Sequence, residues 1–194
     1  DAEDPEQVRR IVQVTTRGPI TVEPRLHATS SACGVCGADL IAMTQRTRHW
    51  PLSEDTASFD VAAVLTQPET LLAAQRGFAA SGGLHAAGLF TPAGELICLR
   101  EDVGRHNAVD KVMGWALQER RLPLRGHALQ VSGRASAELV HKAVMAGVPL
   151  LAAVSAPSTL AVDLARESGL TLVGFLREGS LNVYAGAERL GLAE

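Results

Sequence analysis

Strand-like and helix-like segments alternate through the second half of the chain, and this alternation most constrains its fold. From residue 83 onward, short aliphatic runs are separated by longer segments with a helical repeat of apolar residues. The expected strands are residues 84–90, 95–100, 128–131, 150–154, 170–176 and 181–184, and the expected helices are residues 106–120, 136–146 and 158–168. Such alternation predicts an α/β fold with a largely parallel sheet flanked by helices.

Polar residues gather where four of these strands end. They form the segments 100–106, 132–136, 155–158 and 177–180. In an open parallel sheet the carboxyl ends of the strands share one edge, and ligands bind there. Segments distributed by chance would fall at both edges, so this pattern favours a single binding site.

The residues of these segments suit an anionic, nucleotide-like ligand. Arginine side chains form paired hydrogen bonds to phosphate or carboxylate, and helix starts supply hydroxyl and backbone N–H donors. Taken singly, the serines are explained as helix caps, and a lone histidine in a strand as a hydrogen-bonded core residue. Taken together, the residues predict one site, with the candidates Arg105, His106, Ser132, Gly133, Arg134, Ser155, Ser158 and, from the small-residue segment 82–88, His85.

Cys33 and Cys36 form a CxxC flanked by small residues, and the chain has one further cysteine, Cys98. Two thiols at this spacing can share a metal, form a reversible disulfide, or provide a reactive thiolate and a second thiol that resolves it. A structural zinc needs two more ligands, usually from a second CxxC or paired histidines, and neither pattern occurs here. A reactive thiol is therefore favoured over a metal site or inert packing, with catalytic roles for Cys33 and Cys36 and no permanently bound metal. Cys98, inside a strand, is expected in the core.

Composition argues against several other classes of protein. An apolar content of 46% with 20% charged residues is typical of a globular chain, and 194 residues suffice for one α/β domain with a small appendage. A net charge of −3 argues against a general nucleic-acid or membrane-surface binder. No apolar run approaches the roughly 20 residues of a membrane span, and the acidic start of the chain is unlike a signal peptide. We expect a cytoplasmic protein without nucleic-acid or membrane partners.

The first part of the chain predicts a smaller, separate segment. Residues 8–25 suit a β-hairpin around the Gly18-Pro19 turn. Residues 38–48 suit a helix, residues 49–60 a loop, and residues 68–80 a helix that begins at Pro68. The expected domains are an N-terminal hairpin segment, residues 1–30, and an α/β domain, residues 31–194.

Five motifs of the sequence resemble the FdhD family, the formate dehydrogenase accessory sulfurtransferases or sulfur carrier proteins. The motifs are Ser31-Ala32-Cys33-Gly34-Val35-Cys36-Gly37, Gly82-Gly83-Leu84-His85-Ala86-Ala87, Glu101-Asp102-Val103-Gly104-Arg105-His106-Asn107-Ala108-Val109-Asp110-Lys111, Ser132-Gly133-Arg134-Ala135-Ser136 and Ser155-Ala156-Pro157-Ser158. They follow the order of the family, and the resemblance runs from about residue 8 to the end of the chain. This order makes the resemblance specific.

The resemblance implies a cytidine-deaminase-like fold, a homodimer and a role in sulfur transfer. Sulfur would pass as a persulfide from a cysteine desulfurase to Cys33, with Cys36 assisting or resolving. It would then pass to the Mo-bis(molybdopterin guanine dinucleotide) cofactor, the bound substrate, before that cofactor enters formate dehydrogenase; GDP or GMP would mimic part of it. The cofactor-binding segment of the family maps to Phe175, Leu176, Arg177, Glu178, Gly179 and Ser180.

Two departures from the family pattern and two other interpretations accompany this resemblance. Family members usually carry a further N-terminal region, and a basic residue is common where Ser180 stands.

The first alternative is a cofactor-binding chaperone in which the CxxC binds the cofactor without transferring sulfur. The second is a zinc-dependent, deaminase-like hydrolase, which needs an H-x-E motif; His85 is instead followed by Ala86 and Ala87.

Overall fold

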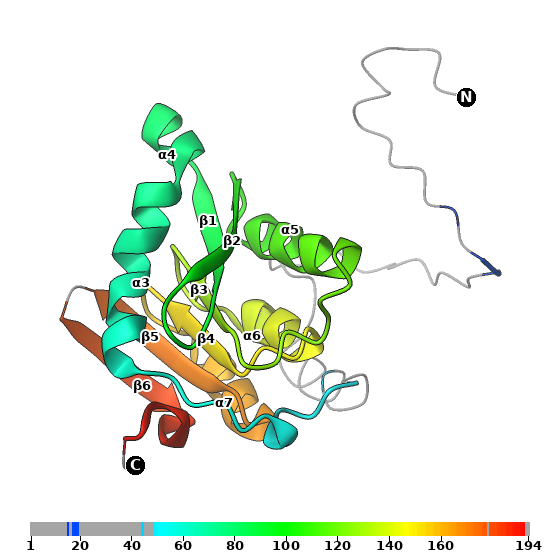
Figure 1. Ribbon diagram of the computed structural model, residues 1–194, viewed down its shortest axis with the longest axis vertical. Coiled ribbons are helices and arrows are strands. Elements are labelled where there is room, and N and C mark those ends of the chain that lie inside the picture. The colour runs from blue at the N-terminus through cyan, green and yellow to red at the C-terminus, as the bar shows by residue number, and fades with distance from the viewer. Residues whose placement is uncertain (1–14, 16, 20–43, 45–48, 178, 193–194) are drawn as a thin grey trace. The chain divides into compact units, whose positions relative to one another are not determined.

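The computed structural model describes residues 15, 17–19, 44, 49–177 and 179–192 (Figure 1). The expected hairpin of residues 8–25, the expected boundary between residues 30 and 31, and both cysteines of the CxxC lie outside these residues. Thr44, within the expected helix 38–48, is helical. The described part of the candidate binding site is built from residues 49–177 and 179–192.

A six-stranded sheet forms the centre of the described part of the chain (Figure 1). In spatial order its strands are β2 (Leu96–Asp102), β1 (His85–Phe90), β3 (Ala128–Val131), β4 (Leu150–Ala153), β5 (Thr171–Arg177) and β6 (Ser180–Ala185). Strands β3, β4 and β5 are parallel, whereas β1 is antiparallel to both β2 and β3, and β6 is antiparallel to β5. The predicted α/β fold is confirmed, with a sheet that is parallel at its centre and mixed overall. The antiparallel pairs β1–β2 and β5–β6 follow short connections, which permit only a hairpin.

Helices cover both faces of this sheet (Figure 1). On one face lie α5 (Arg105–Gln118), α6 (Ala137–Met145) and α7 (Thr159–Ser168), which bury aliphatic side chains of alternate strand residues such as Leu129 and Leu151. The other face is covered by α3 (Val61–Ala74), which packs Val64 and Leu71 against a second cluster containing Leu150 and Val173. None of the described helices combines the length and the apolar character needed to cross a bilayer. The shorter elements are α4 (Arg76–Ser81), η1 (Leu52–Glu54) and η2 (Ala187–Leu190).

The helix expected over residues 68–80 is two helices, and the first begins earlier than predicted. Helix α3 begins after Asp60, whose carboxylate accepts a hydrogen bond from the backbone N–H of Ala62 at 2.9 Å. Pro68 therefore lies inside α3 rather than at its start. The helix ends at Gln75, whose backbone departs from helical geometry before α4 continues. The Asp60 cap and the burial of Val64 stabilise a helix that begins before Pro68. This stabilisation outweighs the usual preference of proline for the first turn of a helix.

Candidate functional site

The ends of four strands meet the starts of two others at one end of the sheet. Strands β2 and β3 run in the same direction because both are antiparallel to β1, and β4 and β5 run parallel to β3. His85, the first residue of β1, therefore pairs with Asp102, the last residue of β2. The segments 82–85, 102–106, 132–136, 155–158 and 175–180 lie together at this end, which we call the polar rim.

The polar rim brings together nearly all of the predicted binding residues. Located there are His85, Arg105, His106, Ser132, Gly133, Arg134, Ser155, Ser158, Phe175, Arg177, Gly179 and Ser180. Leu176 differs, because its side chain is fully buried in the core on the α3 face. Glu178 lies outside the described residues.

Backbone hydrogen bonds tie the segments of the polar rim to one another beyond the ends of the strands. The N–H of Ser155 donates to the carbonyl of Gly133 at 3.3 Å, and the N–H of Ser158 donates to that of Ala135 at 3.0 Å. The N–H of Phe175 donates to the carbonyl of Ser155 at 3.2 Å. Residues from two crossovers and from β5 are therefore held at fixed positions, which lowers the entropic cost of ordering a ligand there.

Three helices begin at the polar rim on the same face of the sheet. Helix α5 begins after Gly104, α6 after Ser136 and α7 after Ser158. The Ser158 hydroxyl caps α7 by accepting from the N–H of Ala161 at 3.2 Å. The N-terminus of a helix carries a partial positive charge and backbone N–H groups without helical partners. Three such ends at one rim, beside Arg105 and Arg134, favour the binding of an anion.

Asp102 fixes the turn that brings Arg105 to the polar rim. Its Oδ1 accepts from the N–H of Gly104 at 2.8 Å and from Nδ2 of Asn107 at 3.0 Å, and its Oδ2 pairs with Nζ of Lys111 at 2.6 Å. The hydrogen bond from Lys111 is the largest cause that lowers the pKa of Asp102 to about 2. The carboxylate is thus fully ionised at neutral pH and shapes the turn that precedes α5.

Replacing Asp102 with asparagine should destabilise the chain in a pH-dependent way. The pKa of the carboxyl is 3.8 ordinarily and about 2 in the folded chain. Its stabilising effect is therefore present above about pH 4 and is lost as the pH falls towards 2. Solvent screening reduces the effect, so we expect Asp102→Asn to lower the free energy of unfolding by about 1 kcal/mol at pH 7. Urea unfolding at several pH values measures this difference, and a difference that stays constant from pH 7 to pH 3 would contradict the assignment.

His106 is a half-buried imidazole that joins the starts of α5 and α6. Its Nε2 lies 3.0 Å from the hydroxyl of Ser136 and 3.6 Å from Oε2 of Glu138. Oε1 of Glu138 lies 3.4 Å from Nζ of Lys142. Burial lowers the pKa of His106, nearby Glu138 opposes this shift, and Arg105 adds to it. His106 is therefore neutral at pH 7 and can donate or accept a hydrogen bond at the rim.

Gly133 lies between the predicted residues His85 and Arg105. A Cβ atom built on Gly133 would lie 3.5 Å from Cε1 and Nδ1 of the His85 ring and 3.8 Å from Cδ of Arg105. Residues from β1, from the segment after β3 and from α5 therefore meet at one point of the rim. Because Gly133 has no side chain, its backbone can be approached by a ligand that lies between His85 and Arg105.

The end of β5 contributes an aromatic ring and a cation. Phe175 has a positive φ of 50°, which is uncommon for a residue with a side chain. The guanidinium carbon of Arg177 lies 5.9 Å from the centroid of the Phe175 ring. The side chains of Arg177 and of Arg134, in the segment after β3, are both exposed. These cations are available to a ligand at the rim.

Gly174 of β5 allows the segment after β4 and Tyr184 of β6 to pack closely against it. A Cβ atom at this position would lie 2.9 Å from Cδ of Pro157, 3.0 Å from Cε2 of Tyr184 and 3.2 Å from the carbonyl oxygen of Ser155.

We expect Gly174→Ala to lower the free energy of unfolding by about 1–3 kcal/mol, because the overpacked segments must shift. Thermal unfolding measures the loss. Gly114→Ala is the control, since a Cβ on Gly114 of α5 meets nothing within 4 Å; it should stabilise the chain by about 0.5–1 kcal/mol. A fully stable Gly174→Ala variant would contradict the prediction.

Cys98 is a core residue, as predicted. It is 5% exposed in β2, and burial raises the pKa of its thiol. Among the described residues, no group of three or more His, Cys, Asp and Glu side chains could hold a metal ion. Cys33 and Cys36 lie outside that set, so their chemistry stays a prediction.

The sequence did not reveal a cavity of about 430 Å³ that borders the polar rim on the α3 face. His85 and Ser132 line it from the rim, and Leu72 and Phe78 line it from α3 and α4. Leu72 is 57% exposed and Phe78 is 36% exposed. The sequence carries no signal for this cavity, because the exposure of Leu72 and Phe78 depends on how α3 and α4 pack.

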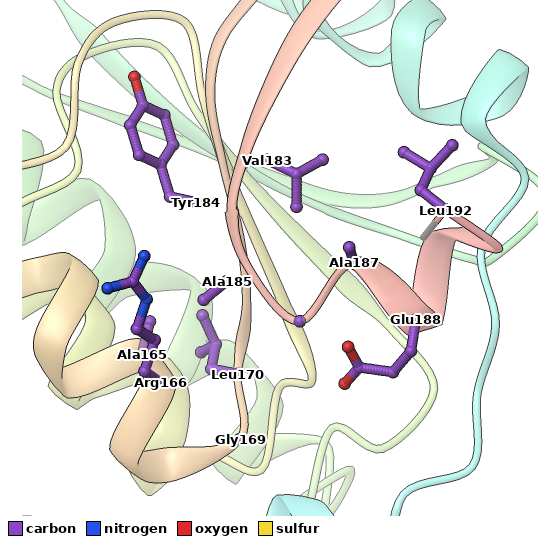
Figure 2. Close-up of a pocket in the computed structure, with 11 residues that line it drawn as sticks. Ala165, Arg166, Gly169, Leu170, Val183, Tyr184, Ala185, Ala187, Glu188 and Leu192 are labelled. Atoms are coloured by element: carbon purple, nitrogen blue, oxygen red, sulfur yellow. The ribbon is translucent and has the colours of Figure 1, made fainter. Parts of the chain in front are cut away.

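A second cavity, of about 670 Å³, lies at the opposite end of the sheet (Figure 2). Arg166 and Gly169 line it at the end of α7, and Tyr184 and Glu188 line it at and beyond the end of β6 (Figure 2). Helix α7 begins at the polar rim and runs away from it, so this cavity is remote from the rim. None of the predicted site residues lines it.

Known proteins match this chain over most of its length. The model of the FdhD/NarQ family matches residues 2–191. The sulfur carrier protein FdhD of Nocardia farcinica is 54% identical over 180 residues, which are 93% of this chain and 64% of that protein. The sulfur carrier protein FdhD of Streptomyces coelicolor is 59% identical over 175 residues, which are 89% of this chain and 61% of that protein. The chain thus spans little more than three fifths of the length of these relatives.

A solved structure agrees with these matches. The crystal structure of a protein from Desulfotalea psychrophila, described as a formate dehydrogenase accessory protein, superposes with a TM-score of 0.65 at 32% sequence identity. The match covers 70% of this chain and 58% of that one. Since the family model covers nearly the whole chain and close relatives share more than half of its residues, the chain belongs to the FdhD/NarQ family.

Proposed function

We propose that this chain carries sulfur from a cysteine desulfurase to the Mo-bis(molybdopterin guanine dinucleotide) cofactor, its bound substrate, on the way to formate dehydrogenase. Family membership and the names of the curated relatives support the sulfur-carrier part. The polar rim supports the choice of a substrate that contains pyrophosphate groups.

The observation that carries the proposal is the convergence of three helix starts with exposed or half-buried arginines at the rim. Helices α5, α6 and α7 all begin there, Arg105 and Arg134 lie at or next to the starts of α5 and α6, and Arg177 ends β5 at the same rim. Backbone N–H groups and guanidinium groups together can neutralise and orient pyrophosphate. A site for a neutral small molecule would not need this concentration of positive potential.

Loading of sulfur follows from thiolate chemistry at the CxxC. The Cys33 thiolate attacks the outer sulfur of the donor persulfide, which forms the Cys33 persulfide and releases the donor cysteine as a thiolate. Cys36 can attack the inner sulfur of that persulfide, which forms the Cys33–Cys36 disulfide and releases hydrosulfide. Delivery to the cofactor therefore has to precede the attack by Cys36.

Intact-mass analysis tests the proposal directly. The full chain is incubated with a cysteine desulfurase and cysteine, and GDP binding is measured separately by titration calorimetry. A mass gain of whole sulfur atoms that reductant removes, together with GDP binding, supports the proposal. Binding of GDP without a mass gain would favour a cofactor-binding chaperone, and a bound metal without a mass gain would favour the hydrolase alternative.

A further inference from the structure

Thr44 is the first residue after the CxxC that the structure describes, and it is wholly buried. Its hydroxyl oxygen lies 2.6 Å from Nδ1 of His141, a half-buried residue of α6. The two residues are 97 positions apart in the sequence, so this hydrogen bond is a tertiary contact. It attaches the chain that follows Cys36 to a helix of the α/β domain.

A hydrogen bond fixes Thr44 more narrowly than apolar packing would. The hydroxyl of Thr44 and the imidazole of His141 both lose hydration at this contact, and the bond between them offsets that loss. Hydrogen bonds depend on distance and on angle, whereas apolar contacts are not directional. The bond therefore selects one position of the chain along α6.

Charged neighbours hold His141 in a defined state. Burial lowers the pKa of its imidazole, Lys142 adds to this shift, and Glu138 opposes it. Lys142 is itself fixed, because its Nζ lies 2.6 Å from Oδ1 of Asp110 on α5 and 3.4 Å from Oε1 of Glu138. His141 is therefore neutral at pH 7, and its bond to Thr44 needs no change of protonation.

Trp50 provides a second contact between the same stretch of chain and α6. A Cβ atom built on Gly147, just beyond the end of α6, would lie 3.5 Å from Cβ of Trp50. The chain thus meets α6 at His141 through Thr44 and meets the end of that helix through Trp50. A chain held at two points of a helix cannot slide along it.

We propose that Thr44 and His141 are positioning residues for the CxxC, and that their hydrogen bond lets a docked protein donor find Cys33 in a defined place. The inference rests on the proposed function, which makes Cys33 the sulfur acceptor, and deepens it by naming the residues that position the thiol. A chain spans at most about 3.5 Å per residue, so an anchor at Thr44 confines Cys33 to a bounded region around α6. Confinement of a reacting group lowers the entropy that the transition state must lose.

Sulfur loading of the full chain from two different donors tests the assignment. One donor is a cysteine desulfurase with cysteine, and the other is glutathione persulfide, a small molecule that needs no docked orientation. In both reactions the Cys33 thiolate attacks the outer sulfur of the donor, and the donor thiol leaves as a thiolate. Thr44→Val should slow loading by saturating desulfurase about threefold to tenfold, because one hydrogen bond is lost. Loading from glutathione persulfide should be unchanged, and intact mass followed over time measures both rates.

Three further variants separate positioning from a general effect. Thr44→Ser keeps the hydroxyl and should restore loading by the desulfurase. His141→Leu should slow loading as Thr44→Val does, and the double variant should be no slower than either single variant, because all three lose the same bond. Thr66→Val is the matched control, since the Thr66 hydroxyl donates to the carbonyl of Ala63 within α3 at 2.9 Å; it should change neither rate.

Two results would overturn the assignment while leaving the proposed function intact. Loading of Thr44→Val by the desulfurase at the unaltered rate would show that the bond does not position the thiol. Equal slowing with both donors would show a general change in the fold or in the thiol. Failure of the unaltered chain to load from either donor would overturn the proposed function and this inference with it. His141→Leu, at a half-buried position, keeps the test decisive should Thr44→Val unfold.

Discussion

The Cys33→Ala variant is expected to take up no sulfur from a cysteine desulfurase, whereas the unaltered chain gains sulfur. Alanine offers no nucleophile for the donor persulfide, so the loaded fraction should fall to background. The role proposed for Cys33 is to carry sulfur and not to contact the nucleotide, so GDP affinity should stay within about twofold. Intact mass spectrometry measures the loading, and titration calorimetry measures the binding of GDP.

Cys36→Ala is the matched control for this prediction. It keeps the Cys33 nucleophile and removes the thiol that releases hydrosulfide, so the persulfide should form and persist longer. If Cys36→Ala lost loading and Cys33→Ala kept it, the roles of the two thiols would be reversed. If Cys33→Ala lost both loading and GDP binding together with its thermal transition, the result would report unfolding, and a purely chemical role would have no support.

Arg134→Ala and Arg177→Ala are each expected to weaken GDP binding about tenfold. A hydrogen bond between charged groups contributes about 1.5–3 kcal/mol when well formed, and the exposure of both side chains places them at the lower end of that range. Persulfide formation at Cys33 should be unchanged, because neither arginine belongs to the CxxC. The affinity for GDP should also fall more steeply with salt in the unaltered chain than in either variant.

Arg166→Ala provides the control for these two variants. Arg166 is an exposed arginine near the end of α7, at the remote cavity rather than at the polar rim (Figure 2). Its removal changes the net charge by the same amount, so it separates a specific contact from a general loss of positive charge. Equal losses of affinity in all three variants would contradict the placement of the pyrophosphate at the rim.

The position of the polar rim could be predicted from the sequence because it depends on chain direction alone. Each helical crossover returns the chain to the same end of the sheet, so segments such as 132–136 and 155–158 must meet there. The prediction holds although β1 is reversed, since the turn at residues 91–95 reverses β1 relative to β2 and brings His85 beside Asp102. Local pattern and connection length together determined which residues became neighbours.

Features that depend on three-dimensional packing could not be predicted. The sequence offered no reason to expect α3 to continue through Pro68, because that outcome depends on the Asp60 cap and on the burial of Val64. The cavity beside α3 was likewise hidden, since the helix expected over residues 68–80 did not indicate that Leu72 and Phe78 would stay exposed. Asp102 was grouped with functional polarity, and its hydrogen bonds show that it holds the turn before α5.

The reversal of β1 divides the polar rim into two parts that different regions of the chain build. The starts of α5, α6 and α7 follow the ends of strands on one face of the sheet, whereas the segment that precedes β1 arrives from α4 on the other. Substitutions in α3 and α4 therefore lie outside the segments that begin α5, α6 and α7, and Ser132 is a residue that belongs to both parts. A fold arranged in this way can vary the apolar walls contributed by α3 and α4 while it keeps the three helix starts.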